Sequence, residues 1–388
     1  MKILQTGDYF LGIQNLGKKE PSPYLFSQIH DYTRYISFIT QYAKSNQVDA
    51  VLLSGNLFFS SLPSDYLQSI ILEQVKELAE SNIDTVVLKG KYDQPTQDYS
   101  FLNFLQSLPY KTTHIVQTDE CVVLKKNQEI VQIVAIPYQN SFATEKTEGF
   151  SHGEIGKKRI AKLLPKVEPD SFSLLFMQAA LSFLEPFFLV PDLPIFLPEY
   201  LKTLPFQYFA FGGQPFKKLE KMSNNTISWI GYAGSLGEFE YADSTIERGF
   251  LVMDTQQPSN PPQFIHNSQQ RPTALIRVYV NSEKEAIEKL NEEFLLNDYR
   301  EHITRIVLHT DASLSLSKIH KHFEDHCFHI HSIEQQGKRL CYVGDEEIVP
   351  IRKYIDIFFE EKRLSFPQDL EEEIENQCLS YISNEFLT

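Results

Sequence analysis

Residues 48–58 read VDAVLLSGNLF, a short apolar run that leads directly into a glycine-containing turn. The run is rich in valine and leucine, and the turn is Ser54-Gly55-Asn56. Such a run, bounded by a turn, is typical of a buried strand in a layered α/β domain. In an open α/β sheet the ligand site lies at the carboxyl ends of the strands, so we expect any chemistry at this turn.

The same pattern recurs through the first half of the chain, where strand-like and helix-like segments alternate. Further strands are predicted at residues 3–4, 85–88, 130–136 and 173–176. Apolar residues spaced for one helix face predict amphipathic helices at 32–45 and 66–80. Two more strands, at 275–280 and 303–308, flank a predicted helix at 284–295. The fold class is therefore predicted to be α/β.

Composition bounds the domain count and the compartment. With 388 residues, of which 42% are hydrophobic, the chain is long enough for about two domains. The longest apolar stretch, residues 181–200, is broken by four prolines and cannot span a bilayer as a helix. The first residues lack the apolar core of a signal peptide, and the four cysteines form no close pair. We therefore expect a cytoplasmic protein with reduced thiols and no membrane partner.

The domain boundary is predicted where the sequence becomes rich in Gln, Asn, Ser and Pro, at residues 256–272. This connector separates a large domain at 1–255 from a small α+β unit at 273–349. Residues 350–388 are predicted to form two helices, each with a proline near its first turn.

Five short motifs follow the predicted strands or lie between them. They are TGDYFLG at residues 6–12, SGNLF at 54–58, GKYD at 90–93, FMQ at 176–178 and FGGQP at 211–215. In order and spacing the five resemble those of SbcD-type DNA nuclease subunits and their archaeal and eukaryotic double-strand-break repair relatives, within the calcineurin-like metallophosphoesterases. The resemblance implies a four-layer metallophosphoesterase β-sandwich flanked by helices, plus a small α+β cap domain and C-terminal helices.

The resemblance also assigns roles to motif positions, because the family uses two manganese ions to activate water for attack on a phosphodiester. The first metal's ligand positions hold Asp8, Phe10, Asn56 and Pro215, and the second metal's hold Asn56, Lys91, Met177 or Gln178 depending on register, and Gly213. The family's catalytic histidine falls at Tyr92, and its orienting aspartate at Asp93.

Most of these side chains cannot ligate a metal. Phe, Pro and Gly side chains have no lone pair to donate, and a protonated Lys repels a cation. Asp8 is the one anionic ligand left, with Asn56 as a weaker candidate. We therefore expect no metal cofactor and no nuclease activity. Two alternatives stay open: an active nuclease that uses relocated ligands or a single metal at Asp8 and Asn56, and a stand-alone binding module that reuses the cleft.

Lys91 suggests how an empty site could be stabilised. A lysine at a former metal position could pair with Asp8 and supply the positive charge of the missing ion. The alternative is that its ammonium group extends to solvent.

Histidines are concentrated late in the chain, with five between residues 320 and 331. On a helix His322 and His326 would share a face, and His329 and His331 would share a face of the next strand, so a zinc site is one interpretation. We favour the other, in which these histidines replace polar residues on a solvated surface.

The final segment carries the predicted partner contacts. In the family, its helices dock on the coiled-coil base of an SbcC-type ATPase, and the resemblance further implies DNA contact and a homodimer within a heterotetramer. The apolar positions that would dock are Ile351, Tyr354, Phe358, Leu370 and Ile374. They would equally serve to pack on the domain's own core. A net charge of −15 opposes binding to a polyanion, so any DNA contact must be local. The resulting hypothesis is a non-catalytic scaffold subunit.

Overall fold

The structure is a computed structural model, which describes residues 1–18, 27–95, 100–139, 152–169, 171–182, 193–223, 227–237, 246–336, 340–342 and 349–350. The chain folds as two compact units, which divide between Arg271 and Pro272.

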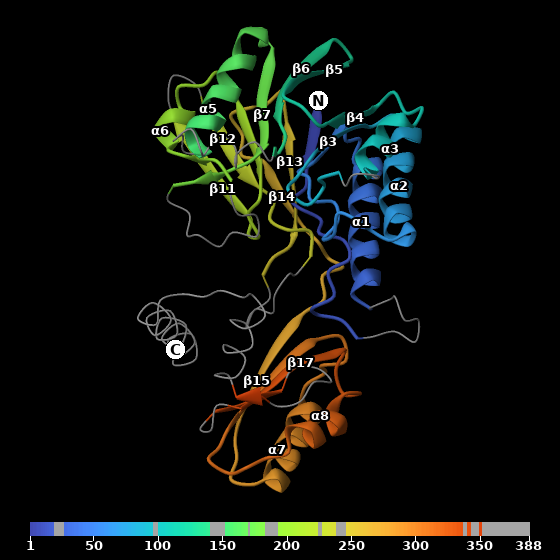
Figure 1. The fold of residues 1–388 in the computed structure, drawn as a ribbon, viewed down its shortest axis with the longest axis vertical. Coiled ribbons are helices and arrows are strands. Elements are labelled where there is room, and N and C mark those ends of the chain that lie inside the picture. The colour runs from blue at the N-terminus through green and yellow to red at the C-terminus, as the bar shows by residue number, and fades with distance from the viewer. Residues whose placement is uncertain are drawn as a thin grey trace. The chain divides into compact units, whose positions relative to one another are not determined.

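The first unit contains two six-stranded sheets (Figure 1). In the first sheet the strands lie in the order β14-β13-β1-β2-β3-β4, with the last four parallel to one another. Its strands are β1 (Lys2–Gln5), β2 (Ala50–Leu53), β3 (Asp84–Leu88), β4 (Thr113–Val116), β13 (Gly249–Asp254) and β14 (Gln263–His266).

The second sheet has the order β11-β12-β10-β7-β6-β5, and its four central strands are parallel. Its strands are β5 (Glu120–Lys126), β6 (Glu129–Ile136), β7 (Phe172–Gln178), β10 (Tyr208–Gly212), β11 (Lys218–Ser223) and β12 (Ile227–Tyr232). A separate two-stranded pair is formed by β8 (Ala180–Leu181) and β9 (Ile195–Phe196).

Alternation along the strands builds a layered core. In β2, Leu52 joins a cluster between the sheets, whereas Val51 and Leu53 face a cluster shared with helices. In β7, Phe176 likewise lies between the sheets and Met177 packs on the opposite face. Because successive strand side chains point to opposite faces, two sheets and two helical layers bury three apolar clusters. The predicted four-layer α/β sandwich is confirmed.

Helices cover the outer face of each sheet (Figure 1). The first sheet is covered by α1 (Gln28–Ser45), α2 (Asp65–Glu80) and α3 (Phe101–Ser107). The second is covered by α5 (His152–Leu163), which continues as the 3-10 turn η1 (Leu164–Lys166), and by α6 (Pro198–Leu201). The Ser64 and Ser100 hydroxyls cap α2 and α3 by accepting from backbone N–H groups of the first turn.

In its described residues, the second unit contains a five-stranded sheet and two helices. Its elements are β15 (Thr273–Tyr279), α7 (Glu283–Leu296), β16 (Ile303–His309), α8 (Leu316–Phe323), β17 (His329–Gln336), β18 (Leu340–Tyr342) and β19 (Val349–Pro350). The first three strands are parallel, and residues such as Leu290 and Phe323 of the helices complete the core with Ile306. The helix and strands expected after residue 273 are present.

The polar segment 256–272 is more than a connector. It contains β14, which pairs antiparallel with β13 and extends the first sheet, and Phe264 and Ile265 are half-buried there. Arg271 at its end pairs with Asp31 of α1, so the segment is held to the first unit. The two predicted helices beyond residue 350 lie outside the described residues.

The core between the sheets gives a first test. Replacing Phe176 by Ala should lower the free energy of unfolding by about 3–5 kcal/mol, because it removes a fully buried ring from between two packed sheets. Phe104→Ala, on the exposed side of α3, should cost less than about 1 kcal/mol. Urea unfolding measures both values, and similar losses in the two variants would contradict this assignment of the core.

Candidate functional site

The site lies where strands of the two sheets end. Asp8 follows β1 and Asn56 follows β2, both in the first sheet, while Gln178 ends β7 and Gly213 follows β10 in the second. The fold brings all four residues together around the carboxylate of Asp8, which is fully buried.

Three N–H donors hold that carboxylate. The side-chain amides of Asn56 and Gln178 both donate to Oδ1, at 3.0 and 2.7 Å. The backbone N–H of Gly213 donates to Oδ2 at 2.8 Å. The register left open by the sequence is thereby decided: Gln178 faces the site, and Met177 packs into the apolar cluster behind it.

The electrostatics of Asp8 reflect opposing effects. Burial raises the pKa of its carboxyl to about 7, since removal from water penalises the charged form. The hydrogen bonds from Gly213, Asn56 and Gln178 act in the opposite direction, and the neighbouring Asp93 adds a small increase. A carboxylate bound only by neutral donors keeps an elevated pKa because no cation compensates its charge.

Asp93 has a different task from the one its motif suggests. Its carboxylate accepts hydrogen bonds from the backbone N–H groups of Asn56 (2.6 Å), Gly90 (2.8 Å) and Leu57 (2.9 Å). Burial raises its pKa to about 6, against the effect of these bonds. Asp93 therefore ties the turn after β2 to the turn after β3, where the family would use it to orient a histidine.

Asn56 joins both carboxylates to the loops. Its Oδ1 accepts from the backbone N–H of Tyr92 at 3.0 Å, while its Nδ2 donates to Asp8. An ionised aspartate here could accept from Tyr92 but could not donate to Asp8. The residue also adopts φ +50°, a left-handed conformation that asparagine tolerates better than most residues.

An apolar cover lies where the family has histidines. Phe10 is fully buried at φ +50° and meets the ring of Tyr92 edge-on at 5.5 Å between centroids. Tyr138, Ile155 and Leu193 complete this cluster. Ile155 and Leu193 carried no recognisable signal in the sequence, because they come from a helix and a separate loop that only the fold brings together.

Gly213 and Pro215 stand at the positions of the last motif's histidines. A side chain at Gly213 would place its Cβ 2.4 Å from Leu193, so that leucine fills the space of the missing side chain. The carbonyl of Pro215 accepts from the buried guanidinium of Arg248 and from the backbone of Ser235. Neither side chain can offer a lone pair to a cation.

The ion pair between Asp8 and Lys91, one of two arrangements that the sequence left open, is not formed. The hydrogen-bond partners of Asp8 among the described residues are Asn56, Gln178 and Gly213, and Lys91 is partly exposed instead. Amide donors satisfy the carboxylate without moving an ammonium group out of water, which would carry a large desolvation cost.

The residues present do not fit the two manganese ions that the resemblance implies. Oδ1 of Asp8 already accepts two hydrogen bonds and Oδ2 accepts a third, and the amide nitrogens of Asn56 and Gln178 point at it. A bound cation would meet these N–H groups, which repel it. No group of three or more His, Cys, Asp or Glu residues in the described ranges is arranged to hold a metal.

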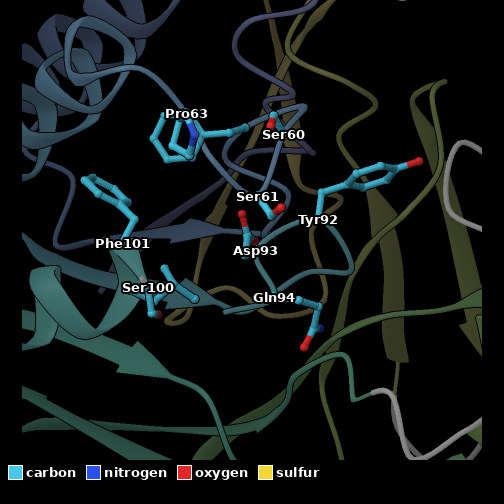
Figure 2. Close-up of a pocket in the computed structure, with 10 residues that line it drawn as sticks. Ser60, Ser61, Pro63, Tyr92, Asp93, Gln94, Ser100 and Phe101 are labelled. Atoms are coloured by element: carbon cyan, nitrogen blue, oxygen red, sulfur yellow. The ribbon is translucent and has the colours of Figure 1, made fainter. Parts of the chain in front are cut away.

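A small pocket opens beside the site (Figure 2). It is lined by Phe58, Ser60, Ser61, Pro63, Tyr92, Asp93, Gln94, Ser100, Phe101 and Leu102. Its cavity volume is about 10 Å³, which is about the space that one water molecule needs. This is below the usual range of small-molecule sites. Phe59 is exposed and stacks on Tyr92, one of the residues that line the pocket.

The histidines between residues 320 and 331 differ in one respect from the predicted arrangement, in which His322 and His326 lie on the same helix. Helix α8 ends at Phe323, so His326 lies beyond it, although its ring still stacks on His322 at 6.3 Å between centroids. His329 lies in β17 and is partly buried, as is His331.

Comparison with known proteins places these observations in context. Mre11 proteins described as DNA double-strand break repair proteins are similar to this chain: that of Archaeoglobus fulgidus is 22% identical over 274 residues, covering 66% of this chain and 58% of that protein. The protein of Sulfurisphaera tokodaii is 25% identical over 321 residues, covering 79% of this chain and 73% of its own length. The SbcD component of the Escherichia coli nuclease SbcCD is 29% identical over 93 residues, which are 24% of this chain and 21% of that component.

The chain has weak but consistent homology to Mre11 and SbcD nuclease subunits. The aligned region spans less than two thirds of the Archaeoglobus protein and about a fifth of the Escherichia coli one. No protein-family model matches the sequence. Among solved structures, the protein TT1561 of Thermus thermophilus covers 69% of this chain at 13% identity and a TM-score of 0.42.

The structure bears on two further predictions, those on partner docking and on membrane spans, only as far as its described residues reach. The proposed docking residues, from Ile351 to Ile374, lie outside them. Within them, no helix combines the length and the apolar character that crossing a membrane requires.

The raised pKa values predict how stability depends on pH. An acid whose pKa rises from 3.8 to about 7 on folding favours the folded state most at low pH, and this contribution is lost as the pH rises through about 7. The free energy of unfolding should therefore fall between pH 4 and 7. Asp8→Asn should make this decline shallower, with the remaining slope from Asp93. Urea unfolding at several pH values tests this, and equal slopes in both proteins would contradict it.

Proposed function

We propose that this chain is a catalytically inactive, SbcD-like subunit of a DNA repair or DNA-processing complex, in which it acts as a scaffold for an SbcC-type coiled-coil ATPase. The observation that carries the inactive part is the hydrogen-bonded state of Asp8. Its lone pairs already receive N–H donors from Asn56, Gln178 and Gly213.

A two-metal phosphodiesterase needs a set of anionic or imidazole ligands that hold both ions and lower the pKa of a bound water. Here Phe10, Gly213 and Pro215 take positions that the resemblance assigns to ligands, and the first of them belongs to an apolar cluster. The proposed subunit therefore does not activate water at this centre. Asp93, the other acidic residue at the motif positions, accepts hydrogen bonds from backbone N–H groups.

The DNA repair role is supported by the homology. Two of the similar proteins are described as DNA double-strand break repair proteins, and a third as one subunit of the nuclease SbcCD. A partner for this chain of the SbcC type follows by analogy with that subunit. The net charge of −15 argues that such a partner, more than the chain itself, would supply affinity for DNA.

The scaffold role can be tested by association. The purified chain should bind the SbcC-like ATPase of the same genome in a pull-down, and Phe358→Asp should weaken binding at least about tenfold by placing a charge in an apolar stripe. Leu295→Asp, at an exposed apolar position on α7, is the matched control and should bind normally. Circular dichroism confirms that both variants fold. No association of the wild type would exclude this partner.

Loss of catalysis is tested separately. After incubation with manganese and gel filtration, elemental analysis should find far less than one ion per chain, and linear double-stranded DNA should stay intact. Asp8→Ala should behave as the wild type in the DNA assay. Retained manganese together with cleavage that Asp8→Ala abolishes would instead establish an active nuclease with relocated ligands.

A further inference from the structure

The carboxylate of Asp8 links the two sheets of the first unit. Asp8 and Asn56 follow strands of the first sheet, whereas Gln178 and Gly213 belong to the second. Oδ1 therefore receives one donor from each sheet, and Oδ2 receives its donor from the second sheet. We call these four residues the Asp8 clasp.

A second hydrogen bond between the two sheets lies next to the clasp. Nε2 of Gln178 also donates to the carbonyl of Ser54 at 3.0 Å, so this one amide bonds both loops of the first sheet. The hydroxyl of Ser54 in turn donates to the carbonyl of Thr6 at 2.6 Å. The ends of β1, β2 and β7 are thus joined through buried polar groups.

The loop after β3 is attached to the same network. Tyr92 donates its backbone N–H to Asn56, and Asp93 accepts from the backbone of Asn56 and Gly90. A Cβ on Gly90 would lie 2.4 Å from Asn56, so the two turns are in close contact. Disturbing Asn56 should therefore disturb every strand-end loop of the first sheet near the site.

A buried carboxylate has to be compensated, and the source of compensation differs from that of a metal centre. A bridging cation draws ligands from both sheets toward one point. Amide N–H groups provide partial positive charge at hydrogen-bond distance from the same atom, and they hold it without an ion. The apolar cluster around Phe10 adjoins this centre, because its member Leu193 lies directly beside Gly213, and Asp8 has no exposed surface.

We propose that the Asp8 clasp replaces a metal centre as the fastening between the two sheets, so that the folded state needs no divalent cation. Asn56 and Gln178 supply the positive ends that ions would otherwise supply. This inference rests on the inactive, metal-free centre of the proposed function, and it is independent of any partner or DNA.

The test uses the full chain and two readouts. Thermal unfolding should give the same Tm in EDTA and in excess manganese, within about 1 °C, since binding to the folded state alone would raise it. Asp8→Ala should lower Tm by about 4–10 °C, because it leaves buried donors without an acceptor. In that variant, hydrogen exchange of the Gly213 amide should become at least about tenfold faster.

Gln178→Leu gives a milder second variant in case Asp8→Ala does not fold. It removes both the bond to Asp8 and the bond to Ser54, and it should lower Tm by about 3–6 °C and speed Gly213 exchange. The matched control is Gln132→Leu. Gln132 lies in β6 of the second sheet and is as buried as Gln178, but its side chain accepts from the backbone N–H of Glu168 and has no bond to Asp8. It should leave Gly213 exchange unchanged, whatever its effect on Tm.

The outcomes separate this inference from the proposed function. Manganese that raises the wild-type Tm by several degrees would overturn the clasp. So would unchanged Tm and unchanged Gly213 exchange in both variants, or faster Gly213 exchange in the control as well. Failure to bind the ATPase, with these results as expected, would overturn the scaffold alone.

Discussion

The free energy of a buried carboxylate constrains the centre of this protein. Asp8 has no exposed surface and no cationic partner among its described contacts, so its charge has to be met by oriented dipoles or neutralised by a proton. The neighbouring residue types follow from this constraint. A donor-bearing amide at residue 56 stabilises Asp8, where a second carboxylate would repel it. Gln178 reaches the same oxygen from the other sheet, and its second bond to Ser54 fixes the direction of its amide.

The apolar residues and the amide residues that stand at the resemblance's metal-ligand positions depend on one another. Gly213 can bring its backbone N–H to Asp8 at φ +90°, and the space beside it is filled by Leu193. Phe10 is fully buried and contacts Tyr92, whose backbone N–H donates to Asn56. Removing water from around Asp8 raises the cost of its charge and at the same time strengthens each hydrogen bond to it. A polar centre of this kind is stable only when every donor is placed, which explains why amides and apolar groups occur together here.

The sequence predicted the parts of this fold that are encoded locally. Strands such as residues 50–53 and helices such as 65–80 show their periodicity within a few residues, and the turns that follow them identified Asp8 and Asn56. The partners of Asp8 could be placed by motif order, but their interactions could not. Gln178 and Gly213 are separated from Asp8 by 170 and 205 residues, and only the packing of two sheets brings their N–H groups to it. The sequence could not decide whether Lys91 pairs with Asp8 for the same reason, because neutral donors from distant strands satisfy the carboxylate instead. β14 was missed because its polar, proline-flanked sequence has little strand character of its own and gains its pairing from β13.

A centre that had merely lost its ligands would leave Asp8 buried and unpaired, at a cost comparable to a large part of a domain's total stability. The side-chain amides of Asn56 and Gln178 remove that cost and hold the strand-end turns by hydrogen bonds in place of a bound cation. Those turns carry Phe59 and Tyr92, whose rings stack on each other, and Tyr92 also lines the small pocket. The strand-end turns are therefore held by hydrogen bonds to buried polar groups, and the proposed non-catalytic role depends on this arrangement.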